Sequence, residues 1–506
     1  MTSPLPAARG LRAGVVGVTA SLIGFLFLVE ITSGILQGFY VPLIPDLVQH
    51  LGINDADFNW FEAAQLLLSA IVVPILAKLG DMVGHKRMLL LATVLTAGAS
   101  WWLVAAGDFT SFLIAWALQG FYVVWLPLEI ALIFDRGRRT GRAASQTRRA
   151  AGLLVVALEA GAIIGALASG VLFGALNENV ALTLTIPAVA VTLVFFAILF
   201  GVPESTPQPG RSLDIVGFTM LTFGLLLITS GLTFLRINGP ATWWVWLLIA
   251  LGVLVFIPFG RYELRQKDPA IDLRVLRQPS MWPVQLTAGL IGISLLGAQA
   301  PLSTFAGTDP VNGYGLGLGS SSRSILIGVY LLSMIIGAVI FPIASRRASP
   351  RIALIGATVL VAVGYGLFLP FHQETWQVFT NMFIAGLGSG ALVGALPAAA
   401  AAAAPIGQTG IAAGLTNTTK TIGGSFASAV FALVLFQGAS TAVTATASSL
   451  SGYMTVWAIC AGGAVVAAVL LFFVPKLAFA DATVPLEEAP ATTGAAGGTA
   501  SERRAS

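Results

Sequence analysis

Long apolar runs recur along the whole chain, and they restrict the possible fold more than any other feature of the sequence. Each run has about 20 residues, the length that an α-helix needs to cross a bilayer core of ~30 Å. Short breaks rich in charged residues, Gly or Pro separate the runs. The sequence therefore predicts fourteen transmembrane helices. Their approximate spans are 14–40, 58–79, 87–107, 110–134, 150–174, 180–201, 214–235, 243–261, 282–303, 322–345, 351–370, 376–398, 409–436 and 453–475.

The composition excludes an ordinary soluble protein. The chain is 57% hydrophobic and 9% charged, whereas soluble domains carry roughly 25% charged residues. A transmembrane β-barrel would alternate apolar and polar residues over segments of about ten residues. Runs such as 247–259 do not alternate. The predicted class is therefore an all-α integral membrane protein.

The distribution of charge predicts how the chain is oriented in the membrane. If the N-terminus is cytoplasmic, nearly all Lys and Arg fall in inside loops, and the outside loops receive only Arg236 and Arg323. Inside loops of membrane proteins are enriched in Lys and Arg. The net charge of +4 is thus explained by topology and not by nucleic acid. We expect a multi-pass protein of the inner (cell) membrane, with both termini cytoplasmic.

The spans fall into groups of six, two and six, separated by polar or charged stretches. This layout predicts two six-helix halves with an inserted central helix pair. The predicted units are a cytoplasmic N-terminus (1–13), an N-terminal half (14–201), a linker with two extra helices and a cytoplasmic loop (202–281), a C-terminal half (282–476) and a disordered cytoplasmic tail (477–506).

Several sites that would indicate another class of protein are not found in the sequence. No Gly-x4-Gly-Lys-Ser/Thr motif is present, which speaks against ATP-driven transport. The histidines His50, His85 and His372 are scattered in loops and form no metal-binding pattern. No nucleophile–base pair emerges either. We therefore expect neither an enzyme nor a cofactor or metal site.

Short motifs lie in the loop after the second span and in the fourth, fifth and thirteenth spans. They are Ala77–Arg87, Ala117–Gly120, Gly161–Gly170 and Gly410–Gly424. Together with the six-plus-six layout, these stretches resemble the major facilitator superfamily, whose two halves surround a site near the bilayer midplane. Gly410–Gly424 and Asp268–Leu273 are similar to the fourteen-helix drug:proton antiporters. The resemblance implies transport by alternating access.

The loop after the second span resembles the family pattern G-x-L-a-D-r-x-G-r-k. The matching residues are Asp81, Gly84, Lys86 and Arg87. Ala77, Met82 and His85 depart from the pattern. In the family this loop latches the halves during conformational exchange, so the resemblance implies a conformational latch. The alternative is an ordinary basic inside loop.

The motifs inside the fourth and fifth spans match the family only partly. Trp116 stands where the family has an Arg that takes part in proton transfer, three residues before Gln119. The resemblance makes these two residues candidates for the cavity or substrate site. In the fifth span, Gly161, Gly165 and Gly170 form an antiporter-like motif in which Ala166 replaces the usual Pro. Small residues four apart also serve general helix packing.

Five charged residues fall inside predicted spans, where a charge costs several kcal/mol and suggests a function. They are Glu30, Glu62, Glu129, Glu159 and Lys420. Burial favours the neutral form of a carboxylic acid, so the four Glu residues are candidates for proton coupling. Each could instead line the cavity or partner another group, such as Asp135 and the basic loop for Glu129.

Lys420 stands where the related antiporters usually have Arg, close to Asn417. Both are candidates for the cavity. Lys420 could balance a carboxylate or recognise an anionic substrate, and the sequence does not decide between the two.

The function that fits best is proton-coupled export of a lipophilic or amphipathic small molecule, as in multidrug efflux or antibiotic resistance. The partners would be this substrate, protons and the lipid bilayer. One alternative is a proton symporter that imports a polar solute, but its cavity would need many hydrogen-bonding side chains. Another is a membrane sensor or scaffold, which would need a folded signalling domain.

Overall fold

The computed structural model describes residues 20–139, 143–207, 212–403, 409–437 and 446–474. The units predicted at 1–13 and 477–506 lie outside these residues. The described residues form helices and connecting segments, with no strand among them. Fourteen helical spans within this part are long and apolar enough to cross a membrane, as the sequence predicts.

Eleven of these spans are single α-helices. They are α3 (Asp55–Val83), α4 (His85–Ala105), α7 (Ala143–Ala175), α8 (Val180–Gly201), α9 (Ile215–Asn238), α10 (Trp243–Glu263), α14 (Ser320–Arg347), α15 (Pro350–Leu367), α16 (Thr375–Ala403), α17 (Thr409–Phe436) and α18 (Leu450–Leu471).

The other three spans are interrupted by a turn of different helix geometry. Their segments are α1 (Ala20–Phe39), η1 (Val41–Leu43) and α2 (Ile44–Leu51); α5 (Phe109–Gln119), η2 (Gly120–Val124) and α6 (Trp125–Arg139); and α12 (Trp282–Gly292), η3 (Ile293–Gly297) and α13 (Gln299–Gly307). The first span was predicted to end at residue 40, but it continues to Leu51. Pro42 and Pro45 lie at this break, where a proline ring cannot donate a backbone hydrogen bond.

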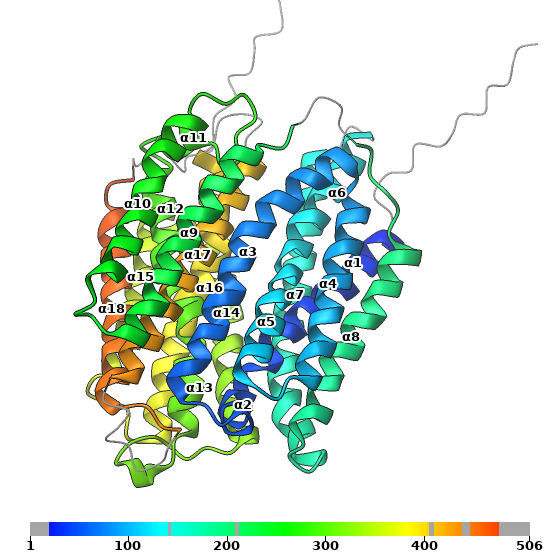
Figure 1. Cartoon of the computed structure of the whole chain (residues 1–506). Coiled ribbons are helices and arrows are strands. Elements are labelled where there is room, and N and C mark those ends of the chain that lie inside the picture. The colour runs from blue at the N-terminus through cyan, green and yellow to red at the C-terminus, as the bar shows by residue number, and fades with distance from the viewer. Residues whose placement is uncertain (1–19, 140–142, 208–211, 404–408, 438–445, 475–506) are drawn as a thin grey trace, which may run out of the picture.

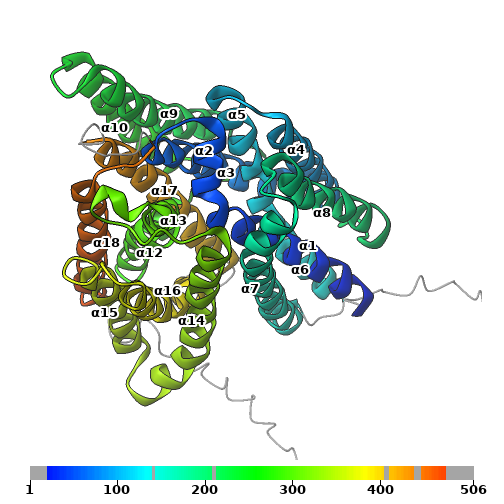
Figure 2. The same cartoon turned by 90° about the horizontal axis from the view of Figure 1, so that it is seen from below.

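The helices form two bundles that meet along two seams (Figures 1 and 2). The first bundle contains α1 to α8, and the second contains α12 to α18. Helix α3 packs on α17 along one seam, and α7 packs on α14 along the other. Two helix pairs therefore hold the two halves together, and each pair consists of one helix from each half.

The inserted helices α9 and α10 lie at the edge of the molecule (Figure 2). Leu221 and Leu225 of α9 pack in one apolar cluster with Leu67 of α3 and Ile422 of α17. Helix α9 thus covers the α3–α17 seam from outside, and α10 packs on α9. This arrangement leaves the inserted pair away from the centre.

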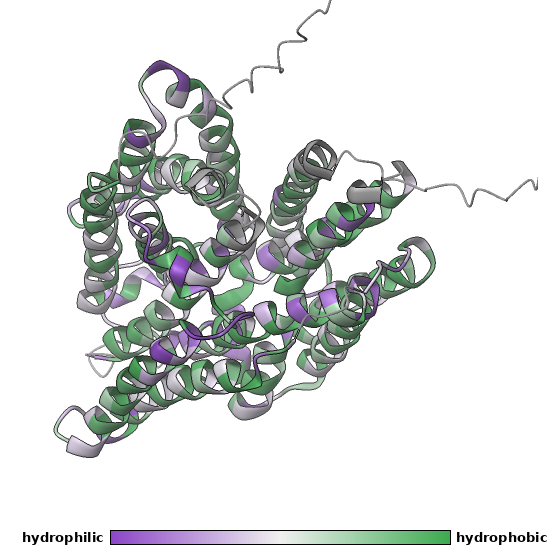
Figure 3. Cartoon of the chain, turned by 90° about the horizontal axis from the view of Figure 1, so that it is seen from above, coloured by the Kyte–Doolittle hydropathy of each residue, from purple (hydrophilic) through white to green (hydrophobic). Residues whose placement is uncertain are grey.

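The outer faces of the bundle are apolar. Large hydrophobic side chains such as Phe200, Trp243 and Val171 are exposed, and Figure 3 shows hydrophobic colour over the outer helices with hydrophilic colour mainly in loops and near the middle. In water such a surface would drive association. In a bilayer it is the surface that contacts lipid.

The two ends of the molecule carry opposite charge. Helix α11 (Leu273–Leu276) lies at one end, and α2 and α13 lie at the other (Figure 1). We name the first the basic end because of Arg87, Arg136, Arg261, Arg346 and Arg347. We name the second the acidic end because of Asp46, Asp55, Asp57, Glu178 and Asp309.

Helices α1 and α7 touch backbone to backbone through glycines. A Cβ added to Gly34 would lie 1.9 Å from the carbonyl oxygen of Leu158, and one added to Gly161 would lie 2.1 Å from that of Ile31. Gly165 makes a similar contact, with 2.8 Å to the carbonyl oxygen of Ile35. The first two glycines of the antiporter-like motif therefore allow α7 to pack closely against α1.

Replacing Gly34 with Ala should weaken this contact, because neither backbone can yield without moving a whole helix. We expect a cost of about 3 kcal/mol or more, seen as a lower thermal unfolding temperature of the purified protein. Gly24→Ala is the matched control on the same helix, since nothing lies within 4 Å of its added Cβ. Equal unfolding temperatures for the two variants would contradict the close packing of α1 on α7.

Candidate functional site

Arg323 of α14 joins the two halves at the acidic end. The residue is 4% exposed, and its side chain forms a salt bridge with Asp46 of α2. Its Nε also donates a hydrogen bond to the carbonyl oxygen of Pro42, at 2.7 Å. Beside it, the Ser303 hydroxyl of α13 donates to the carbonyl oxygen of Val41. We call these five residues the acidic-end gate.

Further contacts across the halves surround the gate. The Asn54 side chain donates to the carbonyl oxygen of Ala447 at 3.2 Å, and the Tyr453 hydroxyl donates to Asp55 at 3.3 Å. The backbone amide of Gly170 donates to the Ser324 hydroxyl at 3.0 Å. Gly170, the third glycine of the antiporter-like motif, therefore lies at the boundary between the halves. Together these contacts close the molecule at its acidic end.

A central cavity lies between the halves. Helices α1 and α7 line it from one half, and η3 to α17 line it from the other. Most lining residues are apolar. The polar lining residues are Gln37, Glu159, Gln299, Tyr330, Tyr365 and Lys420. The chamber thus combines a large apolar surface with a few polar groups, as small-molecule sites generally do.

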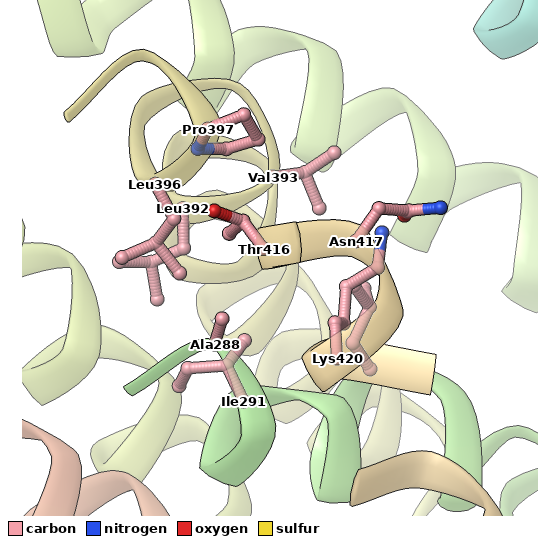
Figure 4. A pocket seen from close by; sticks show the side chains of 10 residues that line it. Ala288, Ile291, Leu392, Val393, Leu396, Pro397, Thr416, Asn417 and Lys420 are labelled. Carbon is pink, nitrogen blue, oxygen red and sulfur yellow. The ribbon is translucent and has the colours of Figure 1, made fainter. Parts of the chain in front are cut away.

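A smaller cavity adjoins the first within the C-terminal half. The two share Leu295, Val393 and Lys420 as lining residues. Figure 4 shows Lys420 and Asn417 extending from α17 beside the apolar side chains of α12 and α16. Because Asn417 lies one turn closer than Lys420 to the basic-end terminus of α17, the smaller cavity extends from Lys420 toward the basic end.

Glu159 and Lys420 carry opposite charges in the central cavity, one from each half. They attract each other electrostatically. No salt bridge or hydrogen bond of the Lys420 ammonium group is present within the described part of the chain. The cavity therefore holds a positive and a negative group that are not in direct contact.

Glu30 of α1 and Glu129 of α6 form a second pair, deep inside the N-terminal half. Both are 0% exposed, and their carboxyl groups are close enough to share a hydrogen bond. Apart from each other, their oxygens have no hydrogen-bond partner among the described residues. Asp135, suggested from the sequence as a neighbour of Glu129, instead accepts a hydrogen bond from the amide of Thr206.

The remaining cavity candidates lie elsewhere in the N-terminal half. Trp116 packs in an aromatic cluster with Tyr40, Phe58 and Phe112. Gln119 donates hydrogen bonds to the Tyr40 hydroxyl at 2.8 Å and to Ser100 at 3.1 Å. Neither Trp116 nor Gln119 is among the described residues that line the two cavities. Glu62 is half-buried on α3 and lies near the Tyr122 hydroxyl.

The predicted latch residues contact the end of α8 and the segment that follows it. The Lys86 amide donates to Glu204 at 2.9 Å, and its ammonium group donates to the carbonyl oxygen of Leu199 at 2.8 Å. Arg87 lies 3.8 Å from the other Glu204 oxygen.

Gly84, Asp81 and His85 form the turn of this loop between α3 and α4. Gly84 has a φ of 121°, and an added Cβ would lie 2.5 Å from Glu204, so a side chain would not fit there. Asp81 pairs with His85 at 3.3 Å. Among the described contacts, the latch residues therefore link α4 to α8 within one half.

The acidic-end gate and Tyr330 were not singled out from the sequence. The sequence did contain one indication of the gate, because Arg323 is one of only two cations assigned to outside loops. The structure places it in the first turn of α14 and buries it. No sequence pattern marks its partners, since Asp46 is 277 residues away.

The structure thus defines a polytopic membrane protein whose two halves enclose a central chamber. A sequence profile described as "Major Facilitator Superfamily" matches residues 26–428. The chain belongs to this superfamily.

Named relatives include exporters and resistance proteins from Streptomyces. The "Probable actinorhodin transporter" of Streptomyces coelicolor is 25% identical over 78% of this chain and 68% of its own length. The "Puromycin resistance protein pur8" of Streptomyces alboniger is 26% identical over 81% and 80%. The "Tetracenomycin C resistance and export protein" of Streptomyces glaucescens is 24% identical over 77% and 71%.

Among solved structures, the nucleoside transporter NupG aligns with a TM-score of 0.60 at 12% identity. The alignment covers 90% of this chain and 98% of that one. At this identity the likeness concerns the fold alone.

Replacing Arg323 with Gln should loosen the acidic-end gate and raise the population that opens there. Loss of an interaction of about 1.4 kcal/mol shifts such an equilibrium roughly tenfold. The measurement is the rate at which a membrane-impermeant maleimide, added on the acidic-end side, labels Gln37→Cys in a Cys460→Ala background. Cys460 is the only cysteine of the chain.

Asp108→Asn is the control, because it removes a charge at the same end from a residue that caps α5 through the amides of Thr110 and Ser111, within its own half. We expect faster labelling for Arg323→Gln only. Equal rates in the two variants would show that Arg323 does not hold this end closed.

Proposed function

We propose that this chain is a proton-coupled secondary transporter that exports lipophilic or amphipathic small molecules by alternating access. The observation that carries this proposal is the mainly apolar chamber between two halves that are joined at the acidic end. A smaller cavity extends from it toward the basic end. With the basic end in the cytoplasm, as the loop charges favour, substrate would enter from inside and leave after the gate opens. The export and resistance functions named for the Streptomyces relatives agree with this direction.

The Glu30–Glu129 pair is our first candidate for the proton site. Two neighbouring carboxylates would repel each other in a medium that cannot solvate them. One shared proton removes one charge and supplies the hydrogen bond between them. Since one member lies on α1 and the other on α6, a change in the packing of these helices would separate the groups and alter proton binding.

Glu159 is the second candidate for the proton site, because it lies in the chamber where substrate would bind. An inward-moving proton supplies about 2.3 kcal/mol per charge at 100 mV. This is enough to concentrate an uncharged substrate roughly fiftyfold for each proton that moves with it. The same driving force would serve either carboxyl site.

The lining of the chamber favours export of amphipathic molecules over import of a polar solute. A polar solute needs a hydrogen-bonding partner for each of its buried polar groups. The lining offers six polar side chains among Leu, Ile, Val, Ala and Met residues. Such a lining suits a molecule with a large apolar body.

Proton flux in everted membrane vesicles tests the proposal. Lipophilic drugs from a panel should collapse an imposed pH gradient, followed with a pH-sensitive dye. We expect Glu30→Gln and Glu129→Gln to abolish this response, because an amide cannot bind and release the proton. Glu62→Gln tests the remaining carboxyl candidate. Glu263→Gln is the matched control, because it makes the same change in a buried carboxyl group of the peripheral helix α10.

Loss of the response in Glu159→Gln alone would move the proton site to the central cavity. A full response in all of these variants would refute a carboxyl-based proton site within the membrane. If drugs accumulate in the vesicles without any proton movement, transport is not coupled to protons.

A further inference from the structure

Lys420 is a half-buried cation inside the span of α17, and it lines both cavities. Its ammonium group has three donors, and none makes a hydrogen bond or salt bridge within the described residues. The charged group that acts on it is Glu159, across the chamber. A cation in a membrane interior normally pairs with another group, so this site lacks a partner that a ligand could supply.

A second unpaired donor lies in the same chamber. The Tyr330 side chain is 3% exposed and lines the central cavity. Its hydroxyl lies near Ser389 and Tyr365 but makes no hydrogen bond in the described structure. The Tyr365 hydroxyl instead donates to the carbonyl oxygen of Ser294, at 2.8 Å. Tyr330 therefore remains available to donate a hydrogen bond to a ligand.

The rest of the lining suits a flexible or aromatic apolar body. It includes Leu296, Leu302, Ile327, Met334 and Met382. Methionine side chains adapt to ligands of different shape and make favourable contacts with aromatic rings. The chamber thus offers one cation, one free hydroxyl donor and a broad apolar wall.

We propose that the substrates of this transporter are amphipathic organic anions, each with one carboxylate or phenolate group on an apolar body. Lys420 binds the acidic group, and Tyr330 donates a hydrogen bond to it. Glu159 repels the anion and acts as the competing counter-charge for Lys420 in the empty transporter. This inference rests on the proposed export function and names its substrate class.

The position of Lys420 favours anions over cations. Lys420 lines both cavities, whereas Glu159 lines only the central one within the described residues. A molecule that arrives through the smaller cavity therefore meets the positive charge first. The adjacent Asn417 adds an amide group that can donate a hydrogen bond.

Binding of three pyrene probes to the purified full-length protein tests the proposal. The probes are 1-pyrenebutyrate, 1-pyrenebutanol and a 4-(1-pyrenyl)butyl trimethylammonium salt, which differ mainly in charge. Saturable energy transfer from tryptophan to pyrene gives the affinity of each. We expect the acid to bind at least about tenfold more tightly than the alcohol or the cation.

Variants assign this preference to the two charged residues. Lys420→Gln should remove the preference for the acid while leaving the affinity for the alcohol nearly unchanged, and Lys420→Arg should retain the preference. Glu159→Gln should strengthen binding of the acid severalfold, because it removes the competing charge. Lys267→Gln removes the same charge from an exposed position outside the cavities and is the matched control.

Any one of four results would overturn the proposed substrate class. They are tighter binding of the cation, equal binding of all three probes, absence of saturable binding, and a preference for the acid that survives Lys420→Gln. If Lys420→Gln does not fold, weaker or unchanged binding of the acid to Glu159→Gln overturns it equally. The binding assay uses no proton gradient, so it tests the substrate class alone. The vesicle assay tests proton-coupled export separately.

Discussion

The hydrocarbon interior of a membrane offers no hydrogen-bond partner to a backbone amide or to a charged side chain, and this structure follows from that constraint. The spans are helical, and the turns η1, η2 and η3 that interrupt three of them consist mostly of residues buried inside the protein. Close contact between helices then depends on packing instead of the exclusion of water. The glycine contacts between α1 and α7 meet this need by bringing the two backbones together.

The same constraint fits the pairing of four of the five charged residues that the sequence places inside the spans. Glu30 and Glu129 face each other within one half, and Glu159 and Lys420 face each other across the chamber. The two pairs differ in what they can respond to. The distance between Glu30 and Glu129 depends on how the helices of one half pack. The distance between Glu159 and Lys420 depends on the separation of the two halves, and a molecule in the cavity would also contact this second pair.

The polar contacts between the halves are concentrated at the acidic end of the molecule. Arg323 and its partners at α2 and η1 join the halves there, and α9 covers one seam without entering the chamber. Since these contacts are polar and few, they can break and reform as a unit. Packed helices within each half are much harder to rearrange. This contrast favours movement of whole halves over distortion of single helices.

The sequence alone determined that the chain is a helical membrane protein with fourteen spans, because length and hydropathy of a span are local properties. Local motifs also identified the superfamily and the intramembrane charges. Only the tertiary structure decided which charges meet. Glu129 is 99 positions from Glu30, and Glu159 is 261 positions from Lys420 in the chain, and no helical periodicity links residues on different helices. The cavity, the gate and the inward packing of Trp116 depend on how helices from both halves assemble, which hydropathy does not encode.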